Sequence, residues 1–74
     1  MKSKFEIEVA CLPSEEDLVC EIYYDGFQWV QIFRKNSQNL IQFYSHPTNN
    51  EWEFSLNDAL EVLEMAKEKF LKYQ

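Results

Sequence analysis

A single Asp-Gly step, Asp25-Gly26, limits the folds open to this chain more than any other feature of its sequence. It separates two runs that are rich in β-branched and aromatic residues, Leu18–Tyr24 and Phe27–Arg34. A two-residue type I′ turn needs a positive φ at both central residues, which Asp tolerates and Gly adopts freely. The sequence therefore predicts a β-hairpin, and counting outward from its turn predicts which residues face each other. These pairs are Tyr24 with Phe27, Ile22 with Trp29, Cys20 with Gln31, and Leu18 with Phe33.

The segment before the hairpin has the pattern of another strand. Between Phe5 and Cys11 apolar side chains alternate with charged ones such as Glu6 and Glu8, which is the period of a half-buried strand. Residues 12–17 are then expected to form a polar loop, because Pro13 cannot donate to a strand ladder and three acids follow it.

After the hairpin, residues 35–38 predict a turn and residues 39–44 a further strand. Either Leu40 or Ile41 faces the apolar side of the hairpin, and the length of the turn decides which, since a shift of one residue exchanges the two faces. A loop follows, and residues 51–54 are a candidate fifth strand.

A C-terminal helix is predicted to begin after Ser55. Ser is a good N-cap, and Asp58 three residues later approximates a capping box. Apolar residues then recur at helical spacing and form one stripe. They are Leu56, Ala59, Leu60, Leu63, Ala66, Phe70 and Tyr73. The pattern predicts a single α+β domain over residues 1–74: a four- to five-stranded antiparallel meander with one amphipathic helix packed on one face.

The charge of the chain disfavours several classes of partner. Its formal net charge is −6, and residues 1–33 carry seven acids against two bases. Nucleic acids and anionic membranes are bound through clustered Lys and Arg, so neither is an expected partner. The sequence shows no apolar run long enough for a signal peptide or membrane span, which predicts a cytoplasmic protein. A surplus of apolar residues on the face that one helix leaves uncovered favours a protein partner.

Few residues suggest catalysis or ligand binding. Cys11 and Cys20 lack metal-ligand spacing and are both expected to be free cysteines that are buried as small apolar residues. His46 stands in a loop without a neighbouring nucleophile or carboxylate, and Gly26 as the sole glycine leaves no phosphate-binding loop. We therefore expect no catalytic residue, no cofactor and no metal site, and a protein that is not an enzyme.

Most of the chain contributes to a resemblance to known proteins. Its parts are the strand and turn of residues 18–26, the strand Ile41-Gln42-Phe43-Tyr44 and a helix with Ala59, Leu60, Ala66 and Lys67. Together they resemble a family of small, mostly uncharacterised acidic bacterial proteins. The whole is also distantly similar to immunity proteins of toxin systems and phage-encoded inhibitors of bacterial defence, and residues 54–61 resemble the strand-to-helix junction of HicB-like antitoxins. The resemblance implies a protein that covers a partner's active or nucleic-acid-binding surface.

The sequence therefore predicts a small acidic protein-binding inhibitor whose partner is another protein with a basic surface. Acidic residues are expected to steer the encounter, and aromatic residues to anchor the complex. The steering residues are Glu15, Glu16, Asp17, Glu21 and Asp25, and the anchors are Tyr23, Trp29, Tyr44 and Trp52. The alternative is a structural homo-oligomer, in its simplest form a homodimer, in which exposed strands of two copies pair.

Overall fold

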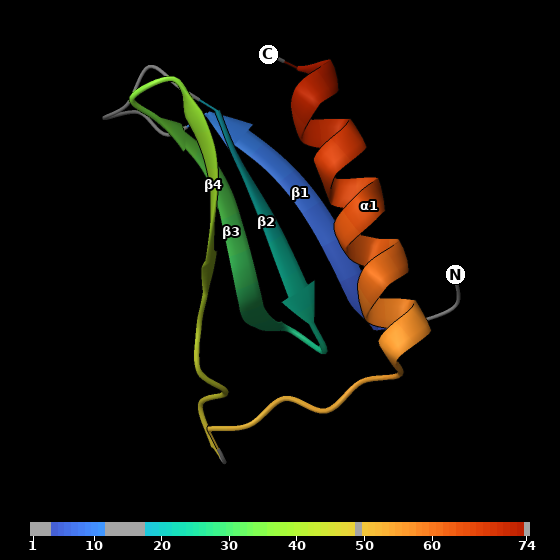
Figure 1. Cartoon of the computed structure of the whole chain (residues 1–74). Helices are drawn as coiled ribbons and strands as arrows, with labels where there is room; N and C mark the ends of the chain where they lie inside the picture. The colour runs from blue at the N-terminus through green and yellow to red at the C-terminus, as the bar shows by residue number, and fades with distance from the viewer. Residues whose placement is uncertain (1–3, 12–17, 49, 74) are drawn as a thin grey trace.

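A computed structural model of the protein describes residues 4–11, 18–48 and 50–73. Its four strands form one antiparallel sheet in the order β1-β2-β3-β4, and a single helix, α1, lies against one side of that sheet (Figure 1). The bounds are β1 Phe5–Cys11, β2 Leu18–Tyr24, β3 Phe27–Lys35, β4 Gln38–Phe43 and α1 Leu56–Lys72. The predicted α+β meander is confirmed with four strands, since residues 51–54 are not part of the sheet.

The turn between β2 and β3 has the predicted backbone. Asp25 and Gly26 both have positive φ, 53° and 87°. The amide of Asp25 also donates to the carbonyl of Lys4 at 3.0 Å, which ties the turn to the start of β1. The second turn, at Asn36 and Ser37, likewise has φ values of 54° and 66°. Two tight turns of the same kind thus connect β2 to β3 and β3 to β4.

The predicted register of the first hairpin is wrong beyond its first pair. Tyr24 faces Phe27 as expected, but a β-bulge lies between Tyr23 and Ile22, where Trp29 is the extra residue on β3. From there the register is shifted by one residue. Ile22 therefore faces Val30, Cys20 faces Ile32, and Gln31 moves to the opposite side of the sheet.

The bulge has a clear physical advantage. It buries two consecutive residues of β3, Trp29 and Val30, on the side of the sheet that the helix covers. Without it, the polar Gln31 would have entered the core and Ile32 would have faced solvent. The core cluster that results is wholly apolar among the described residues. Its members are Cys20, Ile22, Trp29, Val30, Ile32, Val62, Ala66 and Phe70.

The pairing of β3 with β4 decides the question left open for the last strand. Leu40 pairs with Phe33, and Ile41 pairs with Ile32. Ile32 belongs to the core cluster, and cross-strand partners share a face, so Ile41 lies on the helix side of the sheet.

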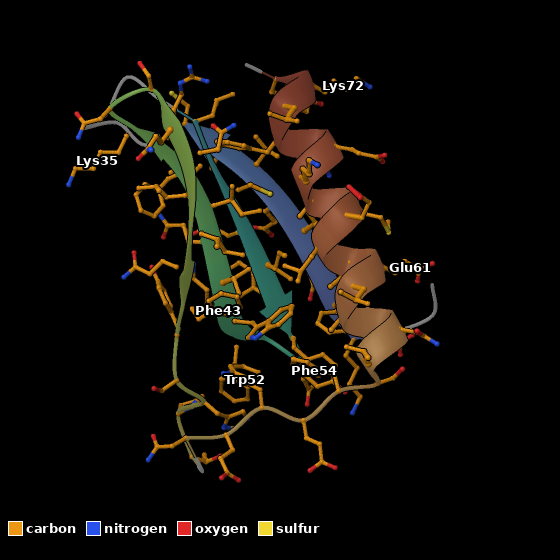
Figure 2. The ribbon with its side chains drawn as sticks, in the orientation of Figure 1. Lys35, Phe43, Trp52, Phe54, Glu61 and Lys72 are labelled. Atoms are coloured by element: carbon orange, nitrogen blue, oxygen red, sulfur yellow. The ribbon has the colours of Figure 1, made fainter. Side chains whose placement is uncertain are left out.

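The chain between β4 and α1 carries aromatic side chains to the end of the sheet. The rings of Phe54 and Trp29 are 4.9 Å apart, and the indole Nε1 of Trp52 donates to the carbonyl of Tyr44 at 2.8 Å. Figure 2 shows Phe43, Trp52 and Phe54 gathered at this end. The helix then begins as predicted, because the hydroxyl of Ser55 accepts a hydrogen bond from the amide of Asp58.

Candidate functional site: the open face of the sheet

The side of the sheet away from α1, which we call the open face, carries a polar row across all four strands. Glu8 faces Glu21 on the neighbouring strand, Glu21 faces Gln31, and Gln31 faces Gln42. Ile7, Val9, Cys20, Ile22 and Ile32 belong to the core or pack against it, and alternation along each strand therefore directs this row away from the helix.

Hydrogen bonds hold the central side chains of this row. The hydroxyl of Tyr23 donates to Glu21 Oε1 at 3.3 Å, and Gln28 Nε2 donates to Glu21 Oε2 at 3.4 Å. The hydroxyl of Tyr44 donates to Gln31 Oε1 at 2.8 Å. Both oxygens of the Glu21 carboxylate are thus oriented, and two tyrosine rings flank the row.

Carboxylates of like charge lie close together on the open face. Glu8 lies directly opposite Glu21, and Glu6 lies opposite Tyr23 in the next row. Like charges that lie directly opposite each other on neighbouring strands destabilise a sheet by roughly a few tenths of a kcal/mol. In the described part of the chain no Lys or Arg forms an ion pair with any of these three carboxylates; the ion pair seen there joins Lys4 to Asp25.

The pKa of the Tyr23 hydroxyl is affected by this local negative charge. Partial burial, and then the charge and hydrogen bond of Glu21, raise the pKa of Tyr23 above its ordinary value, with a further contribution from Glu8. Each cause disfavours a phenolate: burial removes water from it, and the carboxylates repel it. Tyr23 therefore remains a neutral hydrogen-bond donor at neutral pH.

Apolar residues border the acidic row on one side. Val19 is 1% exposed and faces Ala10, while Phe33 and Leu40 face each other on β3 and β4. Val19 is buried, whereas Ala10, Phe33 and Leu40 are half-buried. A polar, charged region beside half-buried apolar side chains is a common composition of protein interfaces.

The structure brings three of the predicted partner-binding residues together, namely Glu21, Tyr23 and Tyr44. Asp25 lies at the β2–β3 turn, where it pairs with Lys4 at 3.9 Å. Trp29 does not lie at the surface: its side chain is 7% exposed and packs in the core, because the bulge directs it there.

Trp52 is half-buried and packs against His46 and Phe54, away from the acidic row. The three loop acids Glu15, Glu16 and Asp17 lie outside the described residues.

The site also contains residues that the sequence prediction missed, above all Glu6 and Glu8. The alternating pattern of β1 did place both acids on a solvent-facing side. It could not place them opposite Glu21 and Tyr23, because the six residues between β1 and β2 leave the register of that pair open.

The rest of the described chain offers few other reactive groups. The thiol of Cys20 is buried as predicted and donates to the carbonyl of Ala66 at 3.8 Å, and burial raises its pKa. The prediction of burial is wrong for Cys11, which is exposed. His46 Nδ1 accepts from the amide of Thr48 at 3.1 Å, and its ring contacts Phe27 and Trp52. Residues 4–11, 18–48 and 50–73 contain no group of three His, Cys, Asp or Glu side chains that could hold a metal ion.

Within the same residues, no helix combines the length and the apolar content needed to cross a bilayer. Comparison of the chain with protein-family models, with curated proteins and with solved structures gave no match.

Proposed function

We propose that this chain is a protein-binding inhibitor that covers a basic surface of another protein with the open face of its sheet. The observation that carries the proposal is the Glu8–Glu21 pair, with Glu6 beside it, which has no internal cation among the described residues. Arg or Lys side chains of a partner would relieve the repulsion between these carboxylates. Binding would then gain both the new ion pairs and the removal of an unfavourable interaction.

The geometry suits a docking surface with ready-made donors and acceptors. Because Tyr23 and Gln28 hold the two oxygens of Glu21, this carboxylate is oriented before a partner arrives. A preorganised side chain loses less rotamer entropy on binding. The rings of Tyr23 and Tyr44 supply the apolar contact area that dominates interface energetics.

Such an interface would inhibit by occlusion. A partner surface rich in Arg and Lys is typical of a nucleic-acid-binding groove, and an acidic sheet laid on it would exclude the natural ligand. This is the mode of action of an immunity, antitoxin or anti-defence protein. We place the activity in the cytoplasm, where the exposed thiol of Cys11 would stay reduced.

The test begins with capture of partners on the full chain at low salt, identified by mass spectrometry. The purified partner is then titrated with the native chain, with the double variant Glu8→Gln/Glu21→Gln and with Glu61→Gln/Glu64→Gln. The last variant removes the same charge from exposed positions of α1. We expect the first variant to bind at least tenfold more weakly, about 1.4 kcal/mol, and the second to bind nearly as the native chain does.

Equal losses in the two variants would show that net charge alone drives binding and would refute the open-face site. A partner whose enzymatic or nucleic-acid-binding activity survives saturation with the chain would refute inhibition while leaving the interface in place.

A second candidate function is self-association through β4. This strand is one edge of the sheet, and its six residues, Gln38–Phe43, contain no charged residue and no Pro. Natural edge strands usually carry such residues to prevent pairing between copies. Light scattering at micromolar concentration tests this function, because a monomer there would exclude it.

A further inference from the structure

The helix leaves the β4 edge of its side of the sheet uncovered. Helix α1 contacts β1 and β2, and β4 lies at the other edge, as Figure 1 shows. Neighbouring strands are about 4.8 Å apart, so four strands are roughly 14 Å wide between their outer axes, while a helix with its side chains is about 10 Å across. The difference of about 4 Å is close to one strand spacing, and Trp29, Val30 and Ile32 of β3 are buried in the core cluster. The uncovered strip therefore lies over β4, and a helix seated there would extend beyond this edge of the sheet.

A groove of about 290 Å³ occupies this strip between α1 and β4. Ile32 and Ile41 form its floor, and Leu63, Phe70 and Leu71 belong to its helical wall. Lys67 is the only charged residue among the described residues that line it. The chain has a net charge of −6, so a groove whose single charge is positive differs sharply from the rest of the surface.

The apolar surface of α1 is wider than its own sheet contact requires. Val62, Ala66 and Phe70 face the core and are nearly inaccessible to solvent. Leu60 and Leu71 lie on the flank toward the groove, in helical register with Leu63, and they are 56% and 44% exposed. On the facing strand Ile41 and Phe43 are 44% and 58% exposed. Two of these exposed residues, Ile41 of β4 and Leu71 of α1, line the groove from opposite sides.

A second copy of this chain does not fit the groove. If two copies paired through their β4 edges, their helices would lie roughly 29 Å apart at this strand spacing, and both grooves would stay open.

If instead α1 of one copy lay in the groove of the other, the side facing away from its own sheet would press on the floor. That side carries Glu61, Glu64 and Glu68. Figure 2 shows Glu61 directed away from the sheet. Burying these carboxylates against Ile41 and Phe43 without a hydrogen-bond or ion-pair partner would cost roughly several kcal/mol.

We propose that the groove is a docking site for an amphipathic helix of a different protein, three to four turns long, that carries an acidic residue opposite Lys67. Its apolar stripe would contact Ile41 and Phe43 below and Leu60, Leu63 and Leu71 at the side. The acidic residue follows from charge complementarity with Lys67. This surface is separate from the open face, so the chain would have two binding surfaces on opposite sides of one sheet.

The probe is a synthetic 16-residue helical peptide with Leu at every third or fourth position and Glu and Ala elsewhere. It is titrated into the full chain, labelled with ¹⁵N and at its Ile and Leu methyl groups, and followed by NMR. We expect saturable shifts at Ile41, Leu63 and Leu71 with a micromolar dissociation constant. A peptide of the same composition without the apolar stripe should bind at least tenfold more weakly. A peptide with Lys in place of Glu should bind severalfold more weakly.

Two variants of equal exposure test the location of the site. Leu71 and Met65 are each 44% exposed, but only Leu71 lines the groove. Leu71→Gln should weaken binding of the striped peptide at least fivefold, and Met65→Gln should leave it unchanged. Both variants change exposed positions of α1, and matching NMR spectra will confirm that each is folded.

Several outcomes would overturn the proposal. One is the absence of saturable shifts at millimolar striped peptide, and another is equal binding of the peptide without the stripe. Sedimentation that reveals a dimer which excludes the peptide would assign the groove to a second copy. Shifts at the same methyl groups with phosphatidylcholine vesicles, and none with the peptide, would assign it to a lipid surface.

Discussion

The helix side and the open face of the sheet are built from alternate residues of the same four strands, yet different forces hold their side chains. On the helix side Ile22, Val30 and Phe70 are fully or almost fully buried, and no polar or charged residue of the described chain is buried with them. On the open face Glu21 and Gln31 are held by hydrogen bonds from neighbouring side chains, at 2.8–3.4 Å.

Because of this difference, the two sides of the sheet should contribute unequally to the stability of the fold and to the binding of a partner. Apolar burial contributes about 25 cal/mol per Å² of surface removed from water, whereas a hydrogen bond that water could replace contributes little. We therefore expect substitutions on the helix side to change the free energy of unfolding, and substitutions on the open face to change binding.

The largest effect is expected at Phe70, which is 1% exposed and contacts the core from the last turns of α1. Phe70→Ala should lower the free energy of unfolding by about 3–5 kcal/mol, because a large cavity would remain. A chain of this length has a total stability of roughly 4–11 kcal/mol, so the variant should be close to unfolding at 37 °C. Urea denaturation followed by tryptophan fluorescence measures the change. Gln42→Ala, on the open face, is the control and should change stability by less than about 0.5 kcal/mol.

The next comparison uses two aromatic residues that the sequence predicted to be equivalent anchors. Trp29→Ala should destabilise the chain by about 3 kcal/mol, because it removes a buried ring that contacts Phe5 and Phe54. Tyr23→Ala should cost about 1 kcal/mol in stability and at least tenfold in affinity for the partner.

Thermal unfolding and partner titration, measured on both proteins, test the pair together. If Trp29→Ala remained as stable as the native chain and lost only binding, the assignment of this residue to the core would be wrong.

The fold was predictable from the sequence wherever local chemistry determines it. Asp25-Gly26 specifies its turn through the backbone of two residues, and Ser55 with Asp58 specifies the start of α1. Both features appear where the sequence placed them. The bulge at Trp29 was not predictable in this way. It depends on the core that β3 shares with α1 and on the contact of Trp29 with Phe54, neither of which any local pattern of β3 contains.

The candidate site was predictable only in part for the same reason. Glu21, Tyr23 and Tyr44 were identified as polar or aromatic residues of two neighbouring hairpins. Their arrangement in one row with Glu8 depends on the register of β1 with β2, and the position of Gln31 in that row depends on the bulge. A polar row across a sheet is therefore a product of register, and a single sequence determines register only near short turns.

A smaller effect is expected at Glu8, where the proposed interface opposes stability. Glu8→Gln removes one of two directly opposed carboxylates and should raise the free energy of unfolding by about 0.3 kcal/mol at low salt. The gain should shrink as salt screens the charges. Glu61→Gln on the exposed side of α1 should show no such gain. A loss of stability in Glu8→Gln would mean that this carboxylate has a stabilising partner and would weaken the case for a basic ligand.

The smallest expected effect concerns the Tyr23 hydroxyl at alkaline pH. Burial and the Glu21 carboxylate raise its pKa in the folded chain above the ordinary value near 10, which the unfolded chain retains. A group with a raised folded pKa contributes stability below its unfolded pKa, and that contribution is lost as the pH rises through the folded value. The native chain should therefore lose more stability between pH 9 and pH 12 than Tyr23→Phe, which lacks the ionising group.

The ¹³Cζ resonances of the tyrosines report the ionisation of each ring separately. We expect Tyr23 to ionise above its ordinary pKa, and Glu21→Gln to bring the Tyr23 pKa part of the way back toward that value, because a neutral amide no longer repels the phenolate. If the pKa of Tyr23 were the same in Glu21→Gln as in the native chain, burial and the other neighbouring groups would account for the whole shift. The Glu21 carboxylate would then exert too weak a field on its neighbours to attract the cations of a partner. This result would contradict the proposal that the open face binds a basic surface.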